Sequence, residues 1–302
     1  MNQSLSSLPQ GVRLGVSPLS WANDVLEDLG ANIPLETCLD DAAAIGYQGI
    51  ELGRKFPRDA ATLRPFLESR GLALASGWHS GELAERDVNA EMAAVAPHAS
   101  LLRDMGSAVM VYGEVAMMTP GTPLDAPMSK RLVMPDDAVA DYVLRLTEFS
   151  KRLRGQYGLR LAYHHHLMMV VETFDEVSAL FDQAGSEVGL LLDTGHAVGA
   201  GFDYALLIER FGDRVAHIHL KDVRSRVMEP VRVGDLSFNE GVRRGMFTVP
   251  GDGDVDFGPV ADFARSGGYQ GWLIVEAEQD PDAAPPRPAV ARAFNHILDQ
   301  LR

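Results

Sequence analysis

The sequence VGLLLDTGH, residues 188–196, is an apolar run that ends in Asp193 and His196. A second run, VAHIHLKD at residues 215–222, carries His219 at the corresponding place. Aspartate oxygens and histidine nitrogens are good ligands for divalent cations, and a buried strand that ends in them is suited to a metal site. Two further apolar runs end in the same kind of side chain, at residues 164–166 (HHH) and 276–278 (EAE). Four such strand ends predict a single metal centre.

Short apolar runs alternate with amphipathic segments along the whole chain. The predicted strands are Arg13–Ser17, Gly49–Leu52, Ala73–Ser76, Ala108–Tyr112, Arg160–Tyr163, Val188–Leu192, Val215–His219 and Trp272–Glu276. The predicted helices are Leu35–Ile45, Ala60–Arg70, Val88–Met105, Asp137–Arg154, Phe174–Gln183, Tyr204–Phe211, Phe257–Ser266 and Ala289–Leu301. Eight strand-helix units in succession predict an α/β fold with a parallel sheet closed into a (β/α)8 barrel, the TIM barrel.

Local signals support these elements. Thr173 followed by Glu176 is a capping box, and Gly46 and Gly71 lie where helix C-caps are expected. Two strand-to-helix connections are long, at residues 113–136 and 223–256, and we expect them to be structureless walls or lids over the C-terminal face of the barrel, where active sites lie.

Composition fits one enzyme-sized domain over residues 1–302, in which residues 1–10 form a loose tail. The net charge of −15 argues against nucleic acid and anionic membranes as partners and favours a cation. The lone Cys38 excludes an internal disulfide, and no secretory signal or apolar membrane span is present in the sequence, so we expect a cytoplasmic location.

Each candidate ligand has a simpler structural explanation. Asp193 is also a good helix N-cap, although the nearby His196 favours a functional role. His219 lies nearer the strand end than His217, which is a candidate for a buried histidine bonded to backbone. Glu276 follows three apolar residues and would be costly to bury without a cation, and Glu278 shares its face.

In the triple histidine, strand alternation places His164 and His166 on one face and His165 on the other. We predict that one of the first pair is a ligand and the other a substrate contact. Glu51 and Glu114 also end strands and are candidates for an acid, a base or a ligand, or for a salt bridge on the rim. No glycine-rich phosphate fingerprint follows a strand, which argues against a nucleotide cofactor.

At this level of detail the chain resembles the xylose isomerase-like superfamily of metal-dependent barrels, and within it the inosose dehydratases. The resemblance rests on DTGH, HIHLKD and the terminal Val-Glu, and on five stretches in order: residues 16–24 (VSPLSWAND), 49–57 (GIELGRKFP), 163–166 (YHHH), 247–253 (FTVPGDG) and 276–281 (EAEQDP). The chain departs from the superfamily at the fifth strand, where histidine replaces the usual glutamate ligand. Nitrogen ligands favour Mn²⁺ or Co²⁺ over Mg²⁺, and the family is associated with those two metals.

The resemblance implies loss of water from a cyclic polyol ketone, scyllo-inosose, in inositol catabolism. It implies a metal held by Asp193, His219, Glu276 and His164. His196 and His166 are then the expected proton-transfer residues, Lys221 would hold the enediolate or a hydroxyl, and Glu51 would assist. Trp21 and Trp78 would stack on the ring or simply pack in the core. A homo-oligomer is expected on the same grounds.

Three alternatives remain open. A ketose isomerase or epimerase on this scaffold would share the first proton abstraction. The sequence DTGHA at residues 193–197 also resembles apurinic-site endonucleases, but 27 basic against 42 acidic residues provide no evident phosphate-binding surface. A metal-free sugar-binding barrel is the third.

Overall fold

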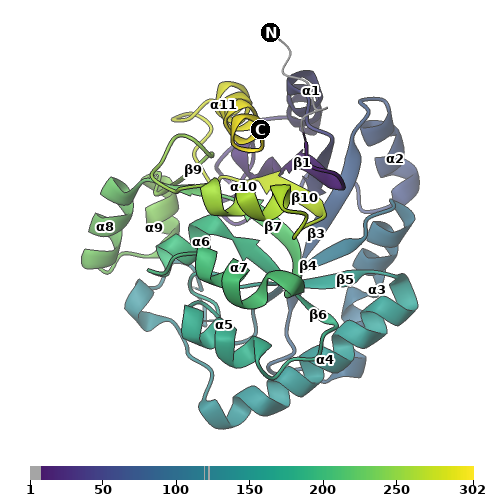
Figure 1. Ribbon diagram of the computed structural model, residues 1–302, viewed down its shortest axis with the longest axis vertical. Helices are drawn as coiled ribbons and strands as arrows, with labels where there is room; N and C mark the ends of the chain where they lie inside the picture. Colours follow the sequence, from purple (N-terminus) through teal and green to yellow (C-terminus); the bar gives the residue numbers. More distant parts are fainter. Residues whose placement is uncertain (1–7, 119, 122) are drawn as a thin grey trace.

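Eight parallel strands form one closed barrel in the computed structural model, which describes residues 8–118, 120–121 and 123–302 (Figure 1). The order around the barrel is β1, β10, β7, β6, β5, β4, β3, β2, and β2 closes the ring against β1. The bounds are β1 Val12–Val16, β2 Gly49–Leu52, β3 Ala73–Gly81, β4 Val109–Glu114, β5 Arg160–His164, β6 Val188–Asp193, β7 Val215–Leu220 and β10 Gly271–Val275. The predicted (β/α)8 barrel is confirmed, and all eight predicted strands are present.

Helices surround the barrel, and each of the eight predicted helices is found within a few residues of its expected ends. Their bounds are α1 Leu35–Ile45, α2 Ala60–Glu68, α3 Val88–Asp104, α4 Asp136–Tyr157, α5 Phe174–Phe181, α7 Ala205–Phe211, α10 Gly258–Arg265 and α11 Pro286–Gln300. The capping box at Thr173 is present, and Gly46 adopts the left-handed conformation (φ 114°) expected of a C-cap.

Two strand pairs carry a one-residue register shift that aims side chains into the barrel. The pairing of β2 with β3 shifts between Ile50 and Leu52, and the pairing of β6 with β7 shifts between Leu190 and Leu191. An extra residue in one strand of a pair re-aims the side chains that follow it. After the second shift, Asp193 pairs directly with His219.

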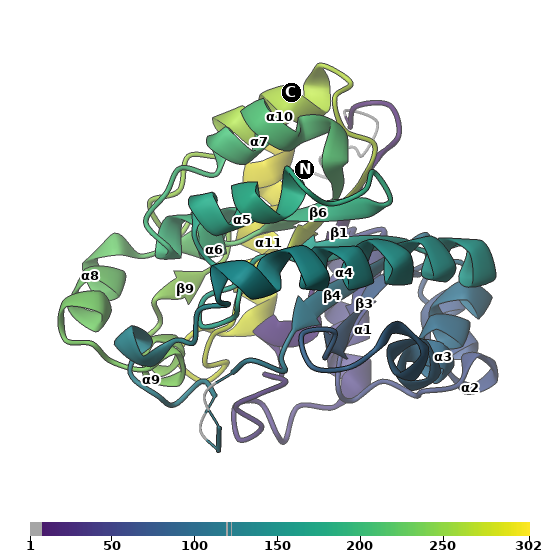
Figure 2. The same cartoon turned by 90° about the horizontal axis from the view of Figure 1, so that it is seen from below.

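The prediction that residues 223–256 lack structure is wrong. This connection contains α8 (Ser225–Val233), α9 (Phe238–Arg243) and an antiparallel pair of β8 (Asp222–Val223) with β9 (Phe247–Thr248). Both views show α8 and α9 projecting from one side of the barrel (Figures 1 and 2). The elements are stable because their apolar side chains form a second cluster, separate from the main core. We call it the cover cluster: Leu26, Leu29, Leu124, Ala126, Leu167, Met168, Val223, Met228, Val231, Phe238, Val242, Met246 and Phe247.

The remaining connections differ less from expectation. A one-and-a-half-turn helix, α6 (Thr194–Gly199), was not predicted, and the connection after β4 contains a 3-10 turn, η3 (Met128–Lys130). Of the expected loose tail, residues 1–7 lie outside the described residues, whereas Leu8 packs against the core. Among the described helices, none combines the length and apolar character needed to cross a membrane.

Candidate metal centre and active site

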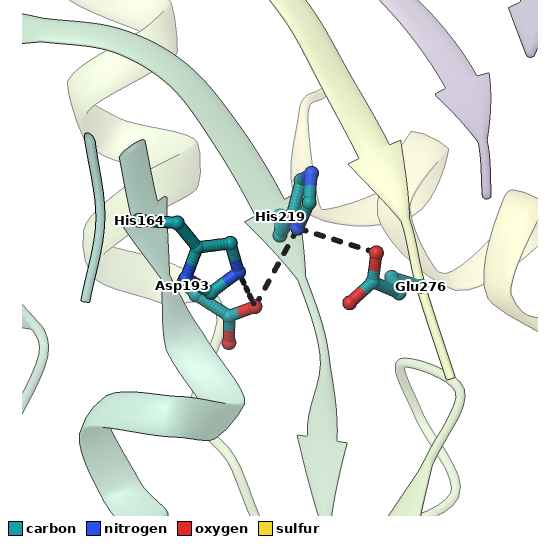
Figure 3. Close-up of side chains that lie close together, drawn as sticks. All are labelled: His164, Asp193, His219 and Glu276. Carbon is teal, nitrogen blue, oxygen red and sulfur yellow. Dashed lines mark ion pairs between the residues drawn. The ribbon is translucent and has the colours of Figure 1, made fainter. Parts of the chain in front are cut away.

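Four potential metal ligands from four neighbouring strands meet at the C-terminal end of the barrel (Figure 3). His164 ends β5, Asp193 ends β6, His219 lies near the end of β7, and Glu276 follows β10. One ligand atom from each lies within 4.8 Å of every other. Oδ2 of Asp193 is 3.5 Å from Nε2 of His164 and 3.6 Å from Nδ1 of His219, which is 3.3 Å from Oε2 of Glu276.

Asp193 is positioned for both roles that the sequence left open. Its Oδ1 accepts a hydrogen bond from the backbone N–H of His196 at 2.8 Å and so caps α6, while its Oδ2 faces the other ligands. The ring of His164 is fixed in a similar way. Its Nδ1 lies 2.6 Å from the carbonyl oxygen of His165. A carbonyl oxygen only accepts hydrogen bonds, so Nδ1 carries the proton and the lone pair of Nε2 points toward Asp193.

The geometry of this group suits a bound cation. Among the described residues, Oδ2 of Asp193 and Nδ1 of His219 are buried without a hydrogen-bond partner, although each lies within ion-pair distance of the other ligands. Buried polar atoms without partners are rare in folded proteins, and a metal ion would satisfy both. Two histidine nitrogens and two carboxylates form a donor set that first-row divalent metals accept.

The charge balance leads to the same conclusion. Four buried carboxylates surround this point: Glu51, Asp193, Glu276 and Glu278. Among the lysines and arginines that the structure describes, only Lys221 lies within 4.0 Å of one of these carboxylates. Buried charge without compensation is costly, and a divalent cation would offset most of this excess.

Glu51 lies behind His219 and holds its ring in place. Its Oε1 accepts hydrogen bonds from Nε2 of His219 at 3.1 Å and from Nε2 of His217 at 2.9 Å, and also from the hydroxyl of Ser76. With its Nε2 proton engaged, His219 presents Nδ1 to the ligand group, as in the carboxylate–histidine–metal arrangement of many metalloproteins. Burial alone would raise the pKa of Glu51, but the two histidines hold it well below its usual range.

Lys221 connects the ligand group to a second set of polar side chains. Its Nζ lies 2.7 Å from Oε1 of Glu276, 3.1 Å from Oε2 of Glu278 and 2.9 Å from Nε2 of His196. Nδ1 of His196 accepts a hydrogen bond from the backbone N–H of Leu167 at 3.2 Å. Burial disfavours charge on Lys221, but Asp193, Glu276 and Glu278 outweigh burial and raise the pKa of Lys221, so this side chain is an ammonium.

The surroundings set the charge states of the remaining titratable groups. Burial, and then His166 and Lys221, lower the pKa of His196 well below its usual range, and burial with His164 does the same for His166. Both imidazoles are therefore neutral near pH 7. Burial raises the pKa of Glu278, whereas His219 and Lys221 outweigh burial at Glu276 and lower its pKa to about 2.

A cavity of about 570 Å³ opens above these residues at the C-terminal face. Its polar floor is formed by Glu51, His164, His166, His219, Glu276 and Glu278, and its walls include the apolar side chains of Trp78, Val111, Met118, Leu124 and Met169. His196 and Lys221 do not line it. They lie behind the floor, at 1% and 0% exposure, so the expected direct contact of these two side chains with substrate is not supported by their position.

Three other candidates lie away from the cavity or point elsewhere. Trp21 is buried in the core and donates its indole N–H to Asp41 at 3.1 Å, so core packing is its role, whereas Trp78 lines the cavity. Glu114 is not on the rim but fully buried, where it accepts hydrogen bonds from Tyr112 and two backbone N–H groups. His165 faces outward from the ligand group, as alternation predicted, and packs against Phe202.

Sequence reasoning missed the partners of Glu51. Ser76 reaches it because of the register shift between β2 and β3, which strict alternation does not show. His217 was expected to bond to backbone, but its Nε2 bonds to Glu51. The only available signal was its place two residues before His219, on the same side of the strand.

Comparison with known proteins agrees with this fold. A family model described as "Xylose isomerase-like TIM barrel" matches residues 39–300. The chain belongs to this family. Among solved structures, that of IolI protein with a bound zinc atom superposes with a TM-score of 0.66 at 15% identity, covering 96% of this chain and 98% of that one, which shows a shared fold.

Curated relatives cover nearly the whole chain. An inosose dehydratase from Geobacillus thermodenitrificans is 37% identical over 293 residues, which are 95% of this chain and 97% of that protein. The rhizopine catabolism protein MocC from Rhizobium meliloti is 44% identical over 275 residues, which are 91% of this chain and 84% of that protein. The relatives that match nearly the whole chain therefore carry two different names, inosose dehydratase and rhizopine catabolism protein.

Proposed function

We propose that this protein is a hydro-lyase that removes water from a cyclic polyol ketone, with scyllo-inosose as the expected substrate, and that it depends on a divalent metal. The observation that carries the proposal is the group of four ligand atoms, three of whose residues (His164, His219 and Glu276) line the floor of the cavity, in a chain 37% identical to a named inosose dehydratase. A cavity with a polar floor and apolar walls suits a ring whose edge bears hydroxyl groups and whose faces are apolar.

His164, Asp193, His219 and Glu276 would hold the metal. Two imidazole nitrogens among the four donors favour Mn²⁺ or Co²⁺ over Mg²⁺. When bound, the cation would polarise the substrate carbonyl and increase the acidity of the neighbouring C–H.

His166 and Glu278 are the side chains placed to move protons, because both line the cavity beside the ligand group. Nδ1 of His166 lies 2.6 Å from the carbonyl oxygen of Leu167 and donates to it, so Nε2 is the atom free to take the α proton. The carboxyl of Glu278 then protonates the departing β-hydroxyl. Lys221 holds Glu278 at 3.1 Å, and His196 holds Lys221, so both act as positioning residues in this scheme.

The proposal is tested by replacing Asp193 with asparagine. Asparagine remains a good N-cap for α6, so the variant removes ligand charge with little effect on the helix. We expect bound metal, measured by elemental analysis, and inosose turnover to fall together. Asp182→Asn, at an exposed ion pair with Arg210, is the matched control and should retain both. Full metal content with full turnover in Asp193→Asn would overturn the ligand assignment.

The reaction type is tested separately. Incubation of the metal-loaded protein with scyllo-inosose should produce the ultraviolet absorbance of a conjugated dione. A ketose isomerase or epimerase would instead convert simple ketoses to new sugars without such absorbance, and that outcome would replace the dehydratase assignment.

A further inference from the structure

A second cavity, of about 310 Å³, lies at the opposite end of the barrel from the candidate active site. It is formed by the N-terminal ends of the strands. The residues that matter are Arg13 of β1, Arg160 of β5 and Arg154 from the last turn of α4, and small residues such as Ala75 and Ala216 line the rest.

This end of the barrel is packed unusually. Branched apolar residues usually fill the interior layers of such barrels. Here alanines leave space, and the inward side chain of Arg13 stacks over the ring of Trp272 at 3.9 Å from its centroid. Arg160 donates from Nη2 to the carbonyl oxygen of Arg214 at 3.1 Å, which orients its guanidinium.

The three arginines carry charge that no carboxylate balances. Within the described chain, no aspartate or glutamate lies within 4.0 Å of Arg13, Arg154 or Arg160, whereas most other arginines form such pairs. Burial lowers the pKa of Arg160, and repulsion from Arg214 and Arg154 adds to the effect, with Tyr269 and Asp213 acting in the opposite direction. A concentration of positive charge in a protein of net charge −15 calls for an anionic partner.

We propose that this cavity binds a small oxyanion of the phosphate class, either free phosphate or the phosphate group of a metabolite. The planar guanidinium group donates paired hydrogen bonds to phosphate oxygens, and three such groups line this one cavity. The volume is large enough for a phosphate group with a small organic substituent. Because the cavity lies at the other end of the barrel, the proposal is independent of the dehydratase assignment.

Isothermal titration with inorganic phosphate, at constant ionic strength set with sodium chloride, tests the site. We expect saturable binding of one phosphate per chain. Because each guanidinium donates charge-assisted hydrogen bonds to the anion, Arg13→Met and Arg154→Met should each weaken binding about tenfold. Arg154→Met is expected to fold normally because the residue is exposed at the end of α4. A parallel titration with a sugar phosphate identifies the source: tighter binding of the ester indicates a metabolite, and equal or weaker binding indicates free phosphate.

Two controls separate this site from others. Arg152→Met, on the same helix but paired with Glu148, should bind phosphate like the wild type. Asp193→Asn should also retain phosphate binding, because Asp193 lies at the other end of the barrel. If the phosphate were instead held by a metal in the active site, this variant would lose it. Absence of saturable binding at millimolar phosphate, binding unchanged by both cavity variants, or loss of binding in Asp193→Asn would each overturn the proposal.

Discussion

Replacing Lys221 with methionine removes a positive charge from the centre of the carboxylate group. The ammonium lies 2.7 Å from Glu276, 3.1 Å from Glu278 and 3.7 Å from Asp193, and the side chain is fully buried. Methionine has nearly the same length and retains the packing of the aliphatic stem, so the variant isolates the charge.

The expected effect follows from these distances. Removal of one partner from a buried ion pair costs about 3–5 kcal/mol because the remaining charge is left uncompensated. We expect Lys221→Met to lose that amount of unfolding free energy in metal-free protein. If a divalent cation binds beside Asp193 and Glu276, it supplies positive charge to the same carboxylates, so the loss in metal-loaded protein should be less than half as large.

Urea unfolding, followed by circular dichroism in chelator and in excess Mn²⁺, measures both values. Lys151→Met removes an exposed lysine and should change stability by less than about 0.5 kcal/mol in either condition. The reasoning is refuted if metal-free Lys221→Met is as stable as the wild type. It is also refuted if the variant loses more stability with Mn²⁺ than without it, because the cation would then not share the carboxylates with Lys221.

Three further predictions concern pH, packing and metal preference. Burial, followed by repulsion from His79, lowers the pKa of His98 to about 4 from 6.5, so the unfolded chain takes up a proton first and stability falls as pH drops below 6.5. His98→Phe should therefore lose about 2 kcal/mol less than the wild type between neutral pH and about pH 5, and identical urea-unfolding losses would contradict this assignment. A Cβ added to Gly113 would meet the Trp78 ring at 2.0 Å, so Gly113→Ala should lower the free energy of unfolding by about 1–3 kcal/mol and reduce turnover. Gly155→Ala, with open space at its Cβ, should instead stabilise α4 by up to about 1 kcal/mol. Equal effects of the two variants in thermal unfolding would refute the packing argument. His164→Glu should shift metal preference toward Mg²⁺, measured by competition against Mn²⁺, and an unchanged preference would show that this side chain is not a ligand.

The barrel was predictable because most strands are short apolar runs that alternate with amphipathic helices, and Thr173 marks the start of α5 with a capping box. The four strand ends that carry metal-type ligands were visible for the same reason, since parallel strands bring their C-terminal ends to one rim. The strand-to-helix order of the chain fixed which side chains meet, without any knowledge of distances.

What could not be predicted depends on register and on long-range packing. The one-residue shifts that turn Ser76 toward Glu51 and align Asp193 with His219 leave no local mark in the sequence. The helices at residues 225–243 were missed because their apolar residues pack against loops from distant parts of the chain, and not against the barrel. Lys221 and His196 were placed near the site correctly, but the sequence does not show that other side chains separate them from the cavity.

The cover cluster has its own apolar interior, distinct from the core that holds the barrel together. Leu124 of this cluster lines the cavity, whereas the ligand group is held by strand ends. Selection for a new substrate can therefore alter the roof of the cavity while the ligand-bearing floor and the barrel core that holds it stay the same. An enzyme engineer could therefore vary Leu124 and the neighbouring cavity wall while leaving the ligand-bearing strand ends unchanged.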